Sequence, residues 1–303
     1  MPTIAEVRAD QMLTPFSVQY ANEQDAYIAD QVLPPVPVAL ESDSYWVYDK
    51  SRFNIPEAKR NPRGHYKEID WTATKDTYFA EEYGLETRID DRERRNAVGE
   101  FDLDEQGVEM LTDAILLNRE RRVANLVTNT ANVTQNTTLT GTAQWSDPAS
   151  DPQAQLRAAR TAIQAGTGLI LNSVAMGWQV FEALRINPRV TDFLDGDRAT
   201  SDSLAEFFEV ANVYIGRASY NTAKEGQTAT LADVWGKDVL FFYKVDRPAL
   251  RRPSFGYQMM VQNLQVERYR DNPAKSDVIR VTEIRGEKLV ATQLGYLVKN
   301  ATA

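Results

Sequence analysis

One long helical segment constrains this chain more than any other feature. Asp102 can act as an N-cap with Glu105 three residues later, and the pattern that follows predicts a helix over about 104–128. At 1.5 Å per residue, this helix is about 37 Å long. Its apolar residues fall on two nearly opposite stripes at about 100° per residue. The first stripe contains Val108, Leu111, Ile115 and Leu126, edged by Arg119 and Arg122, and the second contains Met110, Leu117 and Ala124. A surface helix needs only one apolar stripe, so two predict a spine helix packed on both sides.

Residues 44–80 predict a long β-hairpin. Its expected strands, 44–50 and 66–74, are rich in aromatic and β-branched residues, and a polar tip over 54–64 separates them. A two-stranded hairpin is marginally stable alone in water, so it must lie on its own domain or on another subunit. We favour another subunit, and the candidate contact residues are Tyr45, Trp46, Tyr48, Lys59, Arg60, Arg63 and Trp71.

Residues 1–43 predict an arm. Three prolines within 32–38 exclude a helix there and favour an extended path that lies on a surface, with a stiff linker as the alternative. A polar loop over 128–151 is the best internal boundary. Beyond it we expect helices over 152–165, 176–186 and 203–210, strands over 168–173, 213–216 and 238–243, and tail strands over 257–269, 277–284 and 294–298. This order predicts an α+β fold, with a middle segment inserted between two parts of one sheet.

Composition excludes several classes of function. The 303 residues contain no Cys and one His, which excludes disulfide scaffolds, thiolate zinc sites, cysteine nucleophiles and any triad with two imidazoles. His65 lies in a turn-like stretch, where a solvated loop residue is expected. The net charge of −9, from 34 Lys and Arg against 43 Asp and Glu, argues against a whole-surface grip on nucleic acid. No apolar run reaches the roughly 18–20 residues of a membrane span, and residues 1–10 lack a signal-peptide core.

Motifs for chemistry are weak. The stretch 166–168 lacks the third glycine of a dinucleotide fingerprint, and a calcium loop starting at Asp195 would need glycine where Thr200 stands. The carboxylate pairs Asp90/Asp91 and Asp102/Asp104 could hold magnesium, which is the one enzymatic alternative left; helix caps and salt bridges explain them better. The arginines near 92–95 and 247–252 predict ion pairs. We therefore expect no enzyme, no cofactor and no metal.

Several stretches resemble the major capsid proteins of tailed phages. Residues 29–38 are similar to the passage from arm to extended loop in these coats. Residues 172–181 and 186–190 resemble the strand and helix of the family's axial domain, and 233–243 and 278–283 resemble its later strands. The resemblance implies the tailed-phage major capsid fold. Its parts would be an arm (1–43), an extended loop (44–80), a peripheral domain with the spine helix (81–147), an axial domain (148–250) and return strands (251–303).

The same resemblance implies a shell subunit. Hexamers and pentamers would close an icosahedral head around double-stranded DNA, without sequence-specific binding and without a membrane, assembled in the host cytoplasm. Scaffolding protein and portal are the implied partners, with decoration proteins as a further candidate. Some members carry an N-terminal scaffolding segment; none precedes the arm here, so we expect a separate or already cleaved scaffold. Lys59 is a conceivable crosslink donor, although an ordinary solvated Lys is favoured. An encapsulin-like shell or another phage structural protein, such as a tail component, is the alternative.

Overall fold

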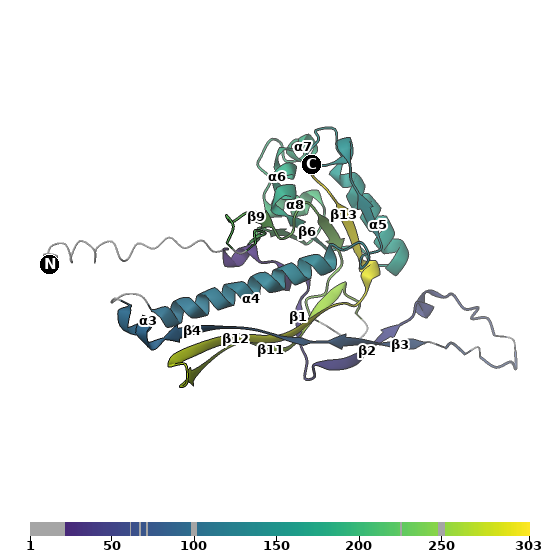
Figure 1. Cartoon of the computed structure of the whole chain (residues 1–303). Coiled ribbons are helices and arrows are strands. Elements are labelled where there is room, and N and C mark those ends of the chain that lie inside the picture. The colour runs from purple at the N-terminus through teal and green to yellow at the C-terminus, as the bar shows by residue number, and fades with distance from the viewer. Residues whose placement is uncertain are drawn as a thin grey trace, which may run out of the picture.

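The structure, a computed structural model, describes residues 22–303 except 61, 67, 71, 98–101, 225 and 248–251, and except the side chain of Arg52. Two sheets organise these residues, and the long helix α4 (Leu103–Val127) runs from one sheet to the other (Figure 1). The α+β expectation is confirmed. Expected elements in residues 1–21 lie outside the described residues.

The first sheet has four strands in the order β1-β11-β12-β4. Its strands are β1 (Pro35–Pro37), β11 (Gly256–Asp271), β12 (Ser276–Leu289) and β4 (Glu81–Asp90). β1 pairs parallel to β11, and the other neighbours are antiparallel. The prolines of β1 fit because it is an edge strand, where a missing N–H leaves no ladder bond broken.

Helix α4 packs across this sheet. It begins where predicted, with the Asp102 carboxylate accepting hydrogen bonds from the backbone N–H groups of Asp104 and Glu105. Leu111 and Ile115 form a small core with Ile89, Ile279 and Val281 of the sheet. The short helix α3 (Asp91–Asn96) precedes α4 and begins with a complete capping box formed by Asp90 and Glu93.

The second sheet has five strands in the order β5-β13-β10-β6-β7 and carries the larger core. Its strands are β5 (Asn136–Thr138), β13 (Gly295–Lys299), β10 (Val239–Phe242), β6 (Ser173–Gly177) and β7 (Asn212–Gly216). The helices beside it are α5 (Pro152–Thr167), α6 (Trp178–Ile186), α7 (Pro188–Phe193) and α8 (Ser201–Phe207). β6 and β10 are buried along their whole length, as expected of central strands covered on both faces.

Two small ribbons complete the fold. β2 (Ser42–Tyr48) pairs with β3 (Ala73–Phe79), and β8 (Ser219–Asn221) pairs with β9 (Leu231–Asp233). The remaining short helices are η1 (Gln24–Ala26), α2 (Ala29–Val32), η2 (Ser51–Phe53), η3 (Gly141–Ala143) and η4 (Thr292–Leu294). The chain between β2 and β3 projects beyond both sheets, at the right of Figure 1.

Three sequence expectations differ from the structure. The second hairpin strand was expected over 66–74 but is β3 at Ala73–Phe79, because Tyr78 packs beside Tyr257 and sets the register. The strand expected over 168–173 begins only at Ser173, since α5 continues to Thr167 and Gly168 ends it in a left-handed conformation at φ 71°.

The third difference concerns where the chain divides. Residues 22–33, expected in a surface arm, are partly core: Ile28, Ala29, Val32 and Leu33 are buried among residues of the second sheet. Val133, Leu139 and Trp145 belong to the same core, and β5 pairs with β13. Packing therefore divides the molecule near the end of α4, earlier than the boundary expected after residue 147. Because residues 128–151 are mostly polar, their composition gives little indication that Val133, Leu139 and Trp145 are core residues.

Candidate assembly surfaces

The β2–β3 ribbon has two different faces. Side chains alternate along a strand, so Tyr45, Asp76 and Tyr78 share the inner face. Tyr78 is buried beside Tyr257 and Met259, and Lys288 of β12 donates to Asp76 at 3.2 Å. The Tyr45 hydroxyl donates to Asp76 at 2.7 Å, and burial together with this carboxylate raises the pKa of Tyr45. The inner face thus belongs to its own subunit.

The outer face of the ribbon is exposed. Trp46 lies opposite Lys75, and the Lys75 ammonium is 4.7 Å from the centre of the Trp46 ring. Trp46 is 57% exposed and Phe79 is 64% exposed, and Tyr48 is exposed beside them. Of the candidate aromatic residues, the structure therefore directs Trp46 and Tyr48 outward and Tyr45 inward, while Trp71 lies outside the described residues.

A polar junction fixes the root of the projecting loop, residues 49–72. The Asp49 carboxylate accepts hydrogen bonds from Ser51 and from the Thr72 hydroxyl, which lower the pKa of Asp49 to about 2. Lys50 Nζ donates to Gln293 at 2.7 Å, and the Phe53 ring lies so close to Gly168 that a Cβ there would be 2.9 Å from Phe53 Cε1. The root is therefore fastened at both ends and rests against the second-sheet region.

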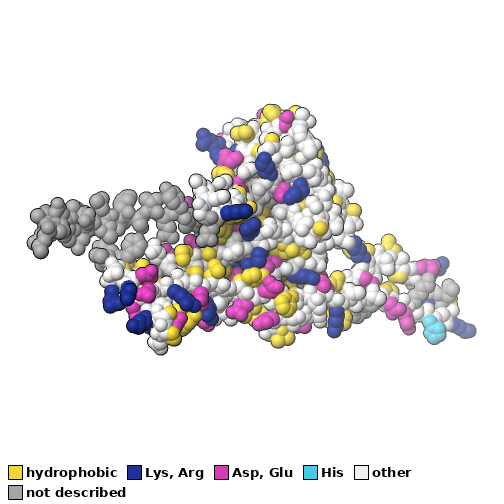
Figure 2. All heavy atoms as spheres, viewed as in Figure 1, with side chains coloured by type: hydrophobic (Ala, Val, Ile, Leu, Met, Phe, Trp, Pro, Cys, Tyr) yellow, Lys and Arg dark blue, Asp and Glu magenta, His cyan; other side chains and the backbone are white. Residues whose placement is uncertain are grey.

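Beyond its root, the projecting loop carries exposed apolar side chains on both sides of its polar tip. Ile55, Tyr66 and Ile69 are at least two-thirds exposed, and half of the sixteen exposed large hydrophobic side chains among the described residues lie within 40–79. The sole histidine, cyan in Figure 2, marks this projecting end. Arg60 donates to the Gly64 carbonyl at 2.7 Å and stacks over Tyr66. Within the described part of the chain, Lys59 and Arg63 form no ion pair.

The two apolar stripes of α4 have different surroundings. Leu111 and Ile115 are buried on the first sheet, with Val108 partly buried beside them. On the other stripe Met110 is 56% exposed and Leu117 is half-buried, whereas Ala124 lies in the larger core. Among the described residues, only the last turns of the helix are enclosed on both sides.

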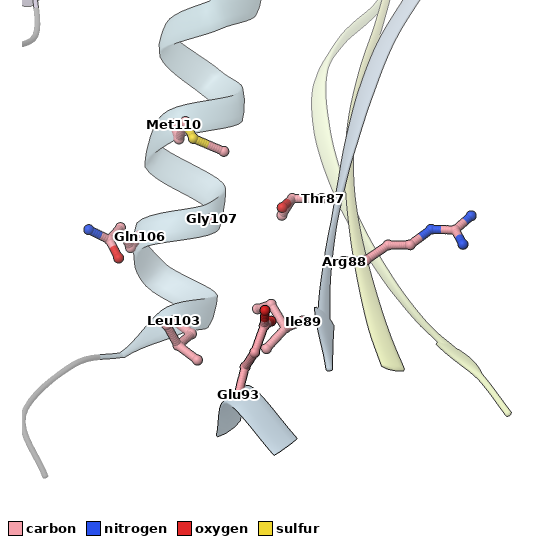
Figure 3. Close-up of a pocket in the computed structure, with 8 residues that line it drawn as sticks. All are labelled: Thr87, Arg88, Ile89, Glu93, Leu103, Gln106, Gly107 and Met110. Atoms are coloured by element: carbon pink, nitrogen blue, oxygen red, sulfur yellow. The ribbon is translucent and has the colours of Figure 1, made fainter. Parts of the chain in front are cut away.

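A hollow of about 360 Å³ lies between the first turns of α4 and β4. It is lined by Thr87, Arg88, Ile89, Glu93, Leu103, Gln106, Gly107 and Met110 (Figure 3). The Arg88 side chain points away from the helix in this view, leaving Glu93 as the charged group at the hollow. A single carboxylate among mostly apolar groups offers no catalytic arrangement.

The carboxylate pairs considered for magnesium have other roles. Asp90 and Asp102 cap α3 and α4, Asp91 pairs with Arg270 at 2.7 Å, and Asp104 pairs with Arg94 at 2.7 Å. These arginines lower the pKa values of Asp91 and Asp104. The expectation of caps and ion pairs is confirmed. Among the residues that the structure describes, no three His, Asp or Glu side chains are grouped as metal ligands, and no helix has the length and apolar character of a membrane span.

Arg119 and Arg122 belong to an ion cluster that joins α2, α4 and β12. Glu283, fully buried, pairs with Arg119 and lies 3.3 Å from Arg122, which is also 3.0 Å from Glu287. Asp30 lies 3.2 Å from both Arg119 and Arg285. In the sequence, the position of these two arginines at the edge of an apolar stripe indicates the cluster. No sequence pattern indicates their carboxylate partners.

Glu120, which sequence analysis missed, has a separate role. Its buried carboxylate accepts hydrogen bonds from the backbone N–H groups of Ile28 and Ala29, at 2.9 and 2.8 Å, and from the Trp235 indole at 2.5 Å. Burial raises the pKa of Glu120. The N-terminal segment is therefore hydrogen-bonded directly to the spine helix.

Comparison with known proteins agrees with these features. No model of a known protein family matches the chain. The chain is 30% identical to the major capsid protein of Pseudomonas phage JBD67, over 97% of each protein, and 26% identical to that of Burkholderia phage BcepMu, over 95% of each.

Solved structures show the same fold. A phage-related protein from Bordetella bronchiseptica RB50 matches 92% of this chain and 94% of its own, with 26% identity and a TM-score of 0.71. The capsid of cyanophage P-SCSP1u matches 96% of this chain and 94% of its own, with 12% identity and a TM-score of 0.63.

The long helix on the first sheet, the second α/β unit and the projecting ribbon thus define a protein with a phage capsid fold. The chain belongs to the family of phage major capsid proteins, as the resemblance in its sequence implied. Many copies of it form the capsid shell of the virion.

Proposed function

We propose that this capsid protein forms hexamers and pentamers, and that its projecting loop and the outer ribbon face make contacts between subunits. The observation that carries the proposal is the concentration of exposed apolar side chains in 40–79. Apolar surface of this extent is more typical of an interface than of a free monomer. Trp46, Tyr48, Lys59, Arg60 and Arg63 are the proposed contact residues on the described part of this region, and Met110 and Leu117 are candidates on α4.

The cations at the tip support an intersubunit role. Lys59 and Arg63 form no ion pair with the described residues of their own subunit, and the chain carries 43 Asp and Glu. Ion pairs at an interface set register and association rate more than affinity, so the tip would align neighbouring subunits while the aromatic groups supply burial.

The family also suggests the surroundings of the protein. We propose assembly in the host cytoplasm with a scaffolding protein and a portal, with decoration proteins as additional candidates, around DNA that is not read by sequence. The negative net charge is compatible with a container that does not trap its genome. No turnover is proposed for the chain.

Both curated relatives are phage capsid proteins, which favours a phage capsid over an encapsulin-like shell. The first-sheet unit would be the peripheral domain and the second-sheet unit the axial domain.

Removing the tip tests the proposal. In the variant, residues 56–64 are replaced by a short turn, which leaves the Asp49 junction and both sheets intact. We expect near-native circular dichroism and melting, because the tip is exposed, together with shells that fail to close in negative-stain micrographs. A variant that assembles as well as the parent would refute the intersubunit role, as would one that unfolds as a subunit.

Charge reversal separates register from burial. The double variant Lys59→Glu with Arg63→Glu should slow assembly in light scattering, with an effect that shrinks as salt is added. The double variant Lys224→Glu with Lys275→Glu, on the exposed β8–β9 and β11–β12 connections, reverses the same number of charges and should assemble normally. Equal slowing in both variants would show that net charge, and not the tip, controls assembly.

A further inference from the structure

The segment 28–33 is held at both ends by side chains from distant parts of the chain. As in every helix, the first N–H groups and the last carbonyl groups of α2 have no partner within the helix itself. Glu120 accepts hydrogen bonds from the N–H groups at the start. At the other end Lys244 Nζ donates to the Gln31 carbonyl at 3.0 Å, and Gln258 Nε2 donates to the Leu33 carbonyl at 2.9 Å.

The segment also inserts one charged side chain into the buried ion cluster. Asp30 Oδ2 lies 3.2 Å from Arg119 Nη1, and Asp30 Oδ1 lies 3.2 Å from Arg285 Nη1. Gln258 Nε2 donates to Asp30 Oδ1 at 2.9 Å. The side chains of Arg119 and Arg285 are 5% and 4% exposed, whereas that of Asp30 is 46% exposed. Asp30 therefore lies at the open side of a buried pair of guanidinium groups.

The charge balance of the cluster depends on this carboxylate. With Asp30, three guanidinium groups (Arg119, Arg122 and Arg285) face three carboxylates (Asp30, Glu283 and Glu287). Without it, three guanidinium groups share two carboxylates, and Arg285 keeps only one carboxylate contact, that of its Nε with Glu283 at 3.5 Å, so the cluster holds an excess of buried positive charge, which is unfavourable. In addition, Arg119 Nε and Arg285 Nε are buried without a hydrogen-bond partner among the described residues. The cluster therefore has both charge and donors for an anion.

We propose that Arg119, Arg285 and Gln258 form a carboxylate-binding site, which Asp30 occupies within the same chain, and that its occupancy locks segment 28–33 onto α4. Guanidinium groups bind the two oxygens of a planar carboxylate with charge-assisted hydrogen bonds, which explains the class of ligand. The Asp30 side chain is 46% exposed, so a small anion from solvent can reach the site when Asp30 is removed.

Chemical rescue with formate tests the site in the full-length protein. Asp30→Ala removes the carboxylate and leaves room for formate at the solvent side. We expect amide hydrogen exchange of residues 29–33 to become about tenfold faster, as expected from the loss of charge-assisted hydrogen bonds. Formate near neutral pH should restore most of the protection, and chloride at the same ionic strength should not.

Three variants control the experiment. Asp25→Ala removes another carboxylate of the N-terminal segment, one that is 70% exposed and pairs with Arg217, and it should change neither exchange nor formate response. Asp30→Asn keeps the volume without the charge, so exchange should be faster and formate should find no room. Asp30→Ala combined with Arg285→Met should lose the response to formate.

The outcomes decide the proposal. Parent-like exchange in Asp30→Ala, equal rescue by chloride, or rescue that persists after Arg285→Met would each overturn it. If Asp30→Ala does not fold in chloride, the folded yield in formate becomes the measurement: recovery in formate supports the site, and failure in both salts overturns it.

Discussion

Two extensions of this molecule look alike in sequence and differ in the structure. Segment 22–38 and loop 49–72 are both rich in polar residues and proline, and neither has a long periodic pattern. The first is locked into the core by Glu120, Asp30 and buried apolar residues. The described residues of the second are fastened at its root, through Asp49 and Lys50, and its apolar side chains beyond the root are exposed. The difference lies in the partners supplied by distant elements, since a segment becomes core only where buried groups elsewhere receive it.

Among the variants, Glu120→Ala should cause the largest loss of stability, because Glu120 holds the N-terminal segment. It leaves two backbone N–H groups and the Trp235 indole without their buried acceptor. Each stranded donor costs about 1–3 kcal/mol, so the free energy of unfolding should fall by about 3 kcal/mol or more in urea titrations. Glu109→Ala, on the exposed side of the same helix, is the control and should stay within about 0.5 kcal/mol. Similar losses in both variants would contradict the role of Glu120.

The two ribbon faces should respond differently to truncation. Tyr78→Ala removes a buried inner-face ring and should lower the free energy of unfolding by about 2–3 kcal/mol. Trp46→Ala removes an exposed outer-face ring and should change it by no more than about 0.5 kcal/mol, while impairing shell assembly. Chemical denaturation and electron microscopy measure the two effects. A large loss of subunit stability in Trp46→Ala would mean that the outer face is packed within the subunit.

Gly286 should be needed where the ribbon crosses β12. A Cβ at this position would lie 2.1 Å from the Phe79 carbonyl oxygen, so Gly286→Ala must push β3 away and should cost about 1–3 kcal/mol. Gly166, within α5, is the matched control, because its nearest neighbour would be 3.5 Å from a new Cβ. Gly166→Ala should stabilise the protein by up to about 1 kcal/mol through helix propensity. Thermal melting of both variants checks the contrast.

The buried carboxyl of Glu120 should impose a pH dependence on folding. Burial raises its pKa above the ordinary 4.5, so the folded state holds this proton more tightly than the unfolded state. That contribution is complete below pH 4.5 and is lost as pH rises through the raised folded pKa. The stability of Glu120→Gln relative to the parent should therefore increase with pH across this window. Parallel curves in urea titrations at several pH values would contradict the prediction.

Asp49 should show the smallest and most local effect. Hydrogen bonds from Ser51 and Thr72 lower its pKa from 3.8 to about 2, so their contribution is present above pH 3.8 and is lost as pH falls through about 2. In Thr72→Val the pKa should rise toward 3.8, as followed by NMR titration of the carboxyl carbon, without a change in melting near neutral pH. An unchanged pKa of Asp49 in Thr72→Val would show that the Thr72 hydroxyl does not stabilise the Asp49 carboxylate.

Local patterns predicted the parts of the fold that depend on neighbours in sequence. The N-cap at Asp102 and the stripe of Leu111 and Ile115 were readable because helical periodicity repeats within a few residues. The start of the following strand differs from the prediction. Gly168 is the C-cap of α5, and the apolar residues after it, expected in a strand over 168–173, precede a strand that begins only at Ser173.

Of the candidate site, the sequence showed an exposed aromatic and basic hairpin but not its two faces. Which of Tyr45 and Trp46 points outward depends on the side from which the first sheet approaches the ribbon. The hollow beside α4 likewise depends on Gly107 meeting Thr87 across two elements, where a Cβ would lie 3.1 Å from Thr87 Cγ2. No periodicity within one segment carries that information.

By itself the sequence determined the spine helix, the α+β order and the lack of thiol or paired-imidazole chemistry, and it supported the resemblance to phage major capsid proteins. The tertiary structure alone decided that residues 28–33 are core and that Asp30 pairs with Arg285, 255 positions away. The physical reason is that helix and strand periods encode contacts two to four residues apart. A buried charge instead takes whichever partner the folded chain brings within hydrogen-bond distance.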